Sequence, residues 1–360
     1  MRYSICLLLV LACQTSFAGY RLETVTDQLV SPWSVAFLPD GSYLVTERGG
    51  NLRRVSAKGV ISEPLLGSPT AYVDGQGGYF DVILDRDFAS NNTIYLSFAS
   101  GTANANATRI VSATLGINRL DDVTPIFTAA PTKDTNAHFG GRLIQLPDQT
   151  LLVTTGDGFD YREAAQDKFS QLGKTLRLNT DGSVPSDNPF ADGQQGNPYV
   201  WSYGHRNPQG LALDTATGNI YLHEHGPKGG DELNLVEPAH NYGWPAITYG
   251  INYSGAYVSP FTTLPGMEQP LTYWVPSIAP SGLTYYDGTA FPAWQGDLFV
   301  GTLVNLDVRR LDMENGKVVA EEIMFTEIGE RVRDIRSGPD GFLYILTDGA
   351  IAKMLRVVPD

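Results

Sequence analysis

The sequence predicts an all-β protein that folds as a six-bladed β-propeller, with four antiparallel strands in each blade. A unit recurs six times in which a turn rich in Asp, Gly, Pro or Asn leads into β-branched and aromatic residues, as in a β-hairpin. The units recur about every 57 residues, a period typical of propeller blades. The 38 glycines and 22 prolines fit a chain rich in turns and poor in long helices.

The six units follow one another through the whole chain. They read LPDGSYLVT from Leu38, DRDFASNNTIYLSF from Asp85, LPDQTLLVT from Leu146, DTATGNIYLHE from Asp214, FPAWQGDLFVGT from Phe291 and GPDGFLYILT from Gly338. A single hairpin cannot bury its own apolar face, whereas sheets closed into a ring bury their faces and protect their edges. Two stacked sheets are disfavoured, because the unit recurs without a compositional break.

Segment 20–30, YRLETVTDQLV, alternates apolar and polar residues, as a half-buried strand does. It precedes the first unit. We therefore expect it to supply the outer strand of the last blade and to close the ring.

The N-terminus has the features of a secretory signal peptide. Arg2 precedes an apolar run over 5–12, and small side chains lie one and three residues before a cut after Ala18. We expect residues 1–18 to be the signal peptide, residues 19–360 to form a single catalytic propeller, and the protein to be periplasmic or secreted. No later segment has the apolar length of a transmembrane helix.

Both cysteines, Cys6 and Cys13, lie in this leader, so the mature chain would have no thiol for a disulfide or a thiolate-metal site. A competing interpretation makes residues 10–13 a lipoprotein signal that anchors the protein through Cys13. The formal net charge of −14 repels phosphate backbones and anionic lipids, which disfavours nucleic-acid and peripheral membrane roles.

Residues 136–143, NAHFGGRL, place a histidine before two glycines, whose missing side chains let a ligand lie close to the backbone. His138 is the best candidate for a general base. A lone histidine could instead cap a loop between blades. However, the next predicted strand ends in TTGDGF, where Asp157 could meet His138 and raise its basicity, as acid-base pairs require.

Three arginines are candidates for binding a polyanionic small molecule. Arg206 and Asn207 lie in a loop that enters a strand, and Arg206 offers a planar fork of five donors suited to carboxylates or a developing oxyanion. Arg331 and Arg333 share one face of an extended segment. They could equally be exposed and paired with neighbouring acids, Glu330 or Asp334.

Residues 223–234, HEHGPKGGDELN, suggest a metal site at first sight. His223 and His225 would point to one side of a β-strand, as zinc ligands can. A zinc site nevertheless lacks an evident third protein ligand nearby.

Calcium suits the same stretch better, because it prefers oxygen donors. Gly226 and Pro227 offer two backbone carbonyls in a rigid turn, and Asp231 and Glu232 offer carboxylates. A Gly-Gly pair at 229 and 230 supplies a sharp bend.

Seven motifs between about Pro32 and Val357 match one known family. They are PWSVAFLPDG, GQGGYFDV, HFGGRL, GKTLRLNTDGSVPSDNPF, YGHRNPQG, EHGPKGGDELNLVEPAHNYGWP and RVRDIRSGPDG. Any one motif is weak, but all seven in order are specific. The chain resembles the soluble glucose dehydrogenases that depend on pyrroloquinoline quinone (PQQ), and most closely their aldose sugar dehydrogenase branch, which are exported six-bladed propellers.

The resemblance implies roles for three catalytic residues. His138 would be the general base that takes the proton of the sugar's anomeric hydroxyl, and Asp157 would orient and polarise it. A hydride would pass from the anomeric carbon to C5 of the quinone, while Arg206 stabilises the charge that develops on the quinone oxygen. The product would be an aldonolactone.

The resemblance also implies binding sites for PQQ and calcium. Its cofactor contacts match Gln76, Arg206, Asn207, Ser277, Arg331 and Arg333, which suits the three carboxylates of PQQ. The carbonyl oxygens of Gly226 and Pro227 would hold a calcium ion that polarises the quinone. Glu232 and Tyr242 match a second, structural calcium. The partners would be a small aldose and an electron acceptor, for which a periplasmic cytochrome or a quinone could serve.

One position departs from the family pattern. Where relatives have a cofactor-binding lysine, this chain has Val304. Loss of one cation beside a tricarboxylate should weaken binding by about 1 to 3 kcal/mol. Arg309 or Arg310 could compensate.

Two other functions are compatible with a propeller. A non-catalytic propeller could bind sugar or protein through the same face, although His138, Asp157 and Arg206 would then have no role. A calcium-dependent lactone hydrolase would hold its metal on side-chain carboxylates near the ring axis and would need no arginine cluster.

Overall fold

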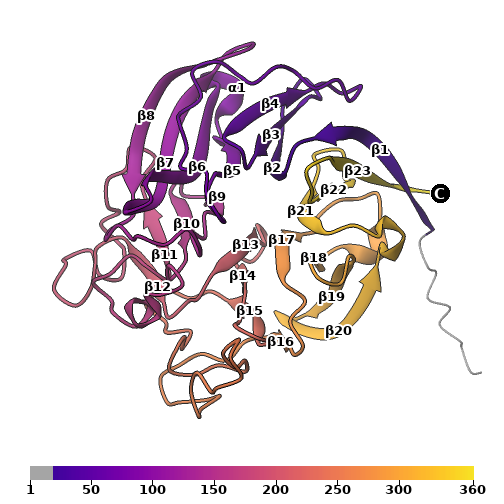
Figure 1. Ribbon diagram of the computed structural model, residues 1–360. Helices are drawn as coiled ribbons and strands as arrows, with labels where there is room; N and C mark the ends of the chain where they lie inside the picture. The colour runs from indigo at the N-terminus through magenta and orange to yellow at the C-terminus, as the bar shows by residue number, and fades with distance from the viewer. Residues whose placement is uncertain (1–18) are drawn as a thin grey trace, which may run out of the picture.

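The computed structural model describes residues 19–360 as six antiparallel sheets arranged around a central axis (Figure 1). The predicted six-bladed β-propeller is confirmed. The expectations of a signal peptide and of a lipoprotein anchor concern residues 1–18 and lie outside the described residues. No helix within 19–360 is long and apolar enough to cross a membrane.

The blades follow one another in chain order, and each begins with its innermost strand. The first holds β2 (Pro32–Phe37), β3 (Tyr43–Glu47) and β4 (Asn51–Val55), and the second holds β5 (Tyr79–Leu84), β6 (Thr93–Thr102), β7 (Ala105–Leu115) and β8 (Leu120–Thr128). The third holds β9 (Leu143–Gln145), β10 (Leu151–Thr155), β11 (Lys174–Leu178) and β12 (Val200–Tyr203), and the fourth holds β13 (Pro208–Leu213), β14 (Ile220–Glu224), β15 (Asp231–Leu235) and β16 (Thr272–Trp274). The fifth holds β17 (Pro280–Tyr285), β18 (Leu298–Thr302), β19 (Val308–Glu314) and β20 (Lys317–Met324), and the sixth holds β21 (Val332–Ser337), β22 (Leu343–Thr347), β23 (Ala352–Pro359) and β1 (Tyr20–Leu29). Short helical turns lie at α1 (Phe88–Asn91), η1 (Arg162–Ala165), η2 (Pro292–Trp294) and η3 (Thr326–Ile328).

The last blade closes the ring by pairing the two ends of the described chain. Strand β1 lies antiparallel to β23, with Tyr20 opposite Pro359 and Leu29 opposite Ala352 (Figure 1). The prediction that segment 20–30 supplies this outer strand is therefore confirmed. The first blade differs slightly from expectation, because it has three strands and only a single bridge, Val55 to Ile61, beyond them.

The hydrophobic core lies between the blades. Six clusters of buried side chains each join two successive sheets, and one of them, with Leu29, Val45 and Leu346, joins the last blade to the first. Each sheet therefore buries both faces, which explains why the second strands of the blades, such as LLVTT in β10 and LYILT in β22, are largely apolar runs rather than alternating ones.

The two ends of the ring have different roles. All six turn units of the sequence connect the innermost strand of a blade to its second strand, so they gather at one end. The residues that precede the inner strands and follow the second strands gather at the other end. His138, Arg206, Ser277 and Arg331 belong to that second group. The repeat that reveals the fold thus marks the face opposite the candidate site.

Candidate active site

A cavity of about 230 Å³ opens at the end of the ring where the inner strands begin. It brings together four of the predicted cofactor contacts, from three different blades. These residues are Gln76, Asn207, Arg331 and Arg333. Pockets of this kind, with a few polar groups on apolar walls, are typical of cofactor and substrate sites.

His138 and Asp157 meet beside this cavity. Asp157 Oδ1 lies 2.7 Å from His138 Nδ1, and both side chains are almost fully buried. A carboxylate can only accept a hydrogen bond, so Nδ1 carries the proton and Nε2 is left as the basic nitrogen. Within 19–360, Nε2 has no hydrogen-bond partner, and it is not fully enclosed.

The electrostatics of this pair favour a neutral imidazole. Burial lowers the pKa of His138 and outweighs the opposing effect of the hydrogen bond that Nδ1 donates to Asp157. Burial alone would raise the pKa of Asp157, but the His138 hydrogen bond and the charge of Arg206 hold that pKa below its ordinary value. The pair therefore presents a neutral histidine, with Nε2 unprotonated, next to an ionised carboxylate.

Further contacts hold the pair in place. Asp157 Oδ2 accepts a hydrogen bond of 2.8 Å from Trp244 Nε1, and Oδ1 accepts another of 2.8 Å from the Phe159 amide. The backbone amide of His138 donates to Gln76 Oε1 at 2.8 Å. His138 itself has a φ of 51°, a left-handed conformation that is uncommon outside glycine. The surrounding hydrogen bonds thus fix a strained residue at the site.

Arg331 and Arg333 share one carboxylate. Asp348 Oδ2 lies 2.9 Å from Arg331 Nε and 3.2 Å from an Arg333 terminal nitrogen. The alternative pairing is wrong, because Glu330 pairs with Lys353 and Asp334 pairs with other arginines. Both predicted arginines are therefore oriented toward the cavity by one acid.

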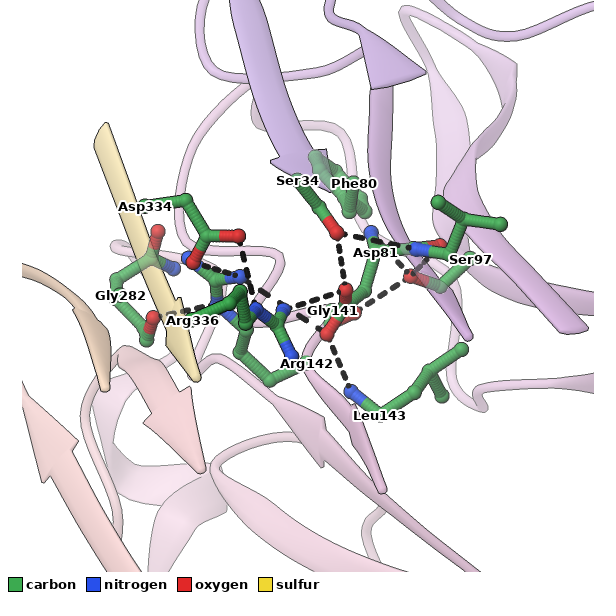
Figure 2. A network of polar contacts seen from close by, with 12 residues as sticks. Ser34, Phe80, Asp81, Ser97, Gly141, Arg142, Leu143, Gly282, Asp334 and Arg336 are labelled. Carbon is green, nitrogen blue, oxygen red and sulfur yellow. Dashed lines mark hydrogen bonds and ion pairs between the residues drawn. The ribbon is translucent and has the colours of Figure 1, made fainter. Parts of the chain in front are cut away.

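A buried polar network closes the axis beneath the cavity (Figure 2). Asp81 and Asp334 bind Arg336 at 2.8 and 2.9 Å, and Asp334 also lies 2.9 Å from Arg142. Arg142 donates to the carbonyl of Gln209, a cavity residue, and its guanidinium lies 4.0 Å from the centre of the Trp33 ring. Arg336 lines a separate cavity at the opposite end. The network therefore supports the floor of the site and separates the two cavities.

Arg206 lies behind the site rather than on the wall of the 230 Å³ cavity. Its guanidinium donates to the carbonyls of His225 and Gly226, at 3.0 and 2.6 Å. The Trp244 ring lies 5.3 Å from it. Arg206 thus contacts one of the carbonyls that were expected to bind calcium.

In the stretch 223–234, the two histidines form hydrogen bonds to the backbone of the next blade. His223 Nε2 and His225 Nε2 donate to the carbonyls of Gly282 and Pro280, at 2.9 and 2.8 Å, so both rings join the fourth blade to the fifth. The Asp231 carboxylate, which we expected to suit calcium, accepts hydrogen bonds from the Gly226 amide and from three groups of segment 277–279. Asp231 ties two loops together.

A second cavity of about 640 Å³ adjoins the first, since both are lined by His225 and Ala279. Gly226, Pro227 and Val304 line it, as does Ser277, whose hydroxyl donates to Asp231 at 2.6 Å. Ser277 therefore lies apart from the arginines.

Glu232 and Tyr242 line one small space together with Glu224. Burial raises the pKa of Glu232 to about 8, and the neighbouring Glu224 acts in the same direction. The Tyr242 hydroxyl donates to the Leu235 carbonyl at 2.6 Å and accepts from the Glu237 amide, so it is already engaged. Glu224 pairs with His205 at 2.8 Å and accepts from the Arg206 amide, whereas Glu232 forms no ion pair in the described chain, so its carboxylate is the one that a cation would offset.

Neither arginine that could have compensated for Val304 lines the first or the second cavity. Arg309 pairs with Asp307 and Glu321, and Arg310 pairs with Asp297 and Glu322. That expectation is wrong, because both guanidinium groups already form ion pairs with carboxylates of the fifth blade.

Sequence reasoning missed several residues of the site. Trp244 and the aromatic wall of Trp33, Phe80 and Phe139 occur in the recognised motifs but gave no chemical signal of their own. Arg48, at the end of β3, also lines the first cavity. Its only sequence signal is a charged residue in a turn after a buried strand, which is common on protein surfaces.

Comparison with known proteins decides the family. The model of the glucose/sorbosone dehydrogenase family matches residues 29–356. The chain belongs to this family. Aldose sugar dehydrogenase YliI from Escherichia coli is 40% identical over 348 residues, which cover 95% of this chain and 94% of the relative. The family resemblance and the enzyme class expected from the sequence are thus confirmed.

Solved structures of family members have the same fold. The apo form of the soluble aldose sugar dehydrogenase from Escherichia coli superposes with a TM-score of 0.91 at 40% identity, covering 95% of this chain and all of the other. The PQQ-bound aldose sugar dehydrogenase from Streptomyces coelicolor superposes with a TM-score of 0.78 at 28% identity, covering 94% and 99%.

Proposed function

We propose that this protein oxidises aldoses at the anomeric carbon to aldonolactones, with PQQ as cofactor and calcium as the metal. The observation that carries the proposal is the buried pair of His138 and Asp157 beside a cavity lined by arginines. A sugar dehydrogenase needs a base for a hydroxyl proton and a place for an anionic electron acceptor. This site supplies both.

The residues of the cavity fit PQQ. Arg331 and Arg333 can form charge-assisted hydrogen bonds with carboxylates, and Gln76 and Asn207 add amide groups. Gly140 on the cavity wall has a φ of 67°, and a Cβ there would lie 2.7 Å from the Thr154 carbonyl oxygen. Glycine at 140 therefore lets this part of the cavity wall pack closely against the backbone of β10.

The residues also fit calcium. Hard cations bind carbonyl and carboxylate oxygens, which Gly226 and Pro227 offer beside the second cavity. Glu232, with its raised pKa, fits a second cation, together with an oxygen contributed by Tyr242. The hydroxyl of Tyr242 is engaged, which leaves its backbone carbonyl for this role.

Proton transfer is the step that the chain's own residues perform. His138 Nε2 accepts the proton of the anomeric hydroxyl, and Asp157 stabilises the imidazolium that forms. Trp244 and the Phe159 amide keep the Asp157 carboxylate oriented during this change. When bound, PQQ supplies the acceptor for the hydride that leaves the anomeric carbon, and calcium supplies Lewis-acid polarisation. Arg206, which donates to the Gly226 carbonyl, would place its positive charge where it stabilises the negative charge that develops on the quinone oxygen.

A lactone hydrolase is a poorer match to this site. It would need carboxylates free to hold a metal near the axis, but Asp81 and Asp334 there are paired with Arg142 and Arg336. Within 19–360, no group of three His, Cys, Asp or Glu side chains could hold a metal ion.

The proposal includes export and an electron acceptor outside the cytoplasm, either a cytochrome or a quinone. The test of function is dye reduction by the purified protein with glucose, PQQ and calcium. We expect reduction that requires both additions, is lost in His138→Ala, and persists in His240→Ala. His240 is half-exposed and pairs with Glu268 on the surface, so it controls for histidine loss. Absence of dye reduction with every aldose tried would contradict the proposal.

A further inference from the structure

We infer that Arg48 is a third anion-binding arginine of the cavity and contacts a carboxylate of the cofactor. This inference rests on the proposed function, because it concerns the residues that hold PQQ. It assigns a role to a residue whose sequence context is common on protein surfaces.

Arg48 is placed at the cavity by its backbone. It follows β3, its amide donates to the Ser31 carbonyl at 2.9 Å, and its carbonyl accepts from the Tyr79 amide at 3.3 Å. Gly78 allows this close approach, since a Cβ at that position would lie 2.9 Å from Cγ of Arg48. The side chain is half-buried and lines the same cavity as Gln76, Arg331 and Arg333.

The guanidinium of Arg48 is available for a ligand. Among residues 19–360 it takes part in no hydrogen bond and no ion pair, whereas Arg331 and Arg333 both bind Asp348. Its charge is nevertheless close to theirs. Burial lowers the pKa of Arg333, and the charge of Arg48 acts in the same direction.

The charge balance of the cavity also points to an anion. Three guanidinium groups and the single carboxylate of Asp348 leave an excess of two positive charges, and no acidic side chain of the described chain lines the cavity itself. Such an excess is unfavourable in a half-enclosed space unless a polyanion offsets it.

Arg48 also accounts for the departure at position 304. Val304 removes a cation from the neighbouring cavity, and Arg309 and Arg310 are paired elsewhere. Arg48 supplies a positive charge to the first cavity from a different blade. Val304 itself is an exposed, apolar residue on the wall of the second cavity.

The experiment is a titration of the purified, calcium-loaded apoprotein with PQQ, followed by quenching of tryptophan fluorescence. Trp33 on the cavity wall is a built-in reporter. We expect Arg48→Gln to raise the Kd about tenfold or more, because a charge-assisted hydrogen bond is lost. Arg48→Lys should recover part of the affinity, and Arg86→Gln, an exposed arginine outside the cavity, should leave the Kd unchanged. The affinity of Arg48→Gln should also depend less on salt than that of the wild type.

The outcomes separate this inference from the proposed function. Unchanged affinity in Arg48→Gln, with lost affinity in Arg331→Gln, would overturn the role of Arg48 and leave PQQ binding intact. No binding of PQQ by the wild-type protein would overturn both. Because the Arg48 side chain makes no contact that folding requires, thermal melting of Arg48→Gln should match that of the wild type.

Discussion

Asp157 Oδ1 lies 2.7 Å from His138 Nδ1, and the second oxygen of the same carboxylate accepts a hydrogen bond from Trp244. The carboxylate therefore joins the proposed base in the third blade to the long loop that follows the fourth blade's strand β15. This three-residue chain fixes both the tautomer and the orientation of the imidazole.

Replacing Asp157 with Asn should lower kcat/KM by roughly 10² to 10⁴-fold. An amide can accept from His138 or from Trp244 but not from both, so one donor would face an amide NH₂ group and the imidazole would adopt the wrong tautomer. Aldose oxidation by the PQQ-loaded variant measures this loss. Asp160→Asn, an exposed acid three residues further on, is the matched control and should retain activity. Full activity in Asp157→Asn would contradict the role of the pair.

The pH profile should show an acid limb that belongs to His138. Its pKa is lowered from 6.5 mainly by burial, so the base stays unprotonated through neutral pH and is lost only as the pH falls through that lower value. Profiles of kcat/KM between pH 4 and 8 measure the limb. Removing Asp157 removes an interaction that raises this pKa, so the limb should move to lower pH in Asp157→Asn. A limb centred well above 6.5 would point to another group.

Lys133 should make stability depend on pH in the alkaline range. Its amine donates to Asn106 Oδ1 and to the Thr135 carbonyl, and burial lowers its pKa to about 7. Between about pH 7 and the ordinary value near 10.5, the unfolded chain binds this proton and the folded chain does not. The free energy of unfolding should therefore rise with pH over that range.

Denaturant unfolding of Lys133→Met at several pH values tests this prediction. The variant should have a shallower slope than the wild type between pH 7 and 10, by up to about 1.4 kcal/mol per pH unit. Lys168→Met serves as the control with a lysine on the surface loop of the third blade. Identical slopes in Lys133→Met and the wild type would show that Lys133 stays charged when folded.

Calcium should stabilise the folded protein partly through Glu232. A ligand that binds only the folded state adds about 2.7 kcal/mol at a hundredfold excess over its Kd. We expect calcium to raise the Tm of the wild type. The increase should be smaller in Glu232→Gln, because the charged carboxylate that would bind the ion is replaced by a neutral amide. Glu237→Gln, an exposed neighbour, should respond like the wild type. An equal calcium response in all three proteins would place the stabilising ion elsewhere.

The sequence predicts the fold well because the turn chemistry repeats. The six units each occupy the connection between the first two strands of a blade, and their Asp, Gly and Pro residues specify the turn locally. The ring closure by β1 was also predictable from local sequence, because alternation of apolar and polar residues indicates a half-buried strand. The missing fourth strand of the first blade has no such signal.

The site was less predictable from residues alone, because it forms between blades that are far apart in sequence. The pairing of Arg331 and Arg333 with Asp348, the hydrogen bonds of Asp231 to segment 277–279, and the pairing of Arg309 with Glu321 on the adjacent strand depend on how strands and loops pack. Arg48 and Trp244 reach the site from loops whose local sequences are unremarkable. Motifs identify the candidates, whereas the packing of six sheets decides which of them meet.

The most direct test of the central claim is oxidation of glucose that carries deuterium at its anomeric carbon by the protein loaded with PQQ and calcium. The account predicts a turnover several-fold slower than with unlabelled glucose and a product that has lost the deuterium, because the bond to that hydrogen is the one that breaks. A product that retains the deuterium, or no oxidised product at all, would contradict it.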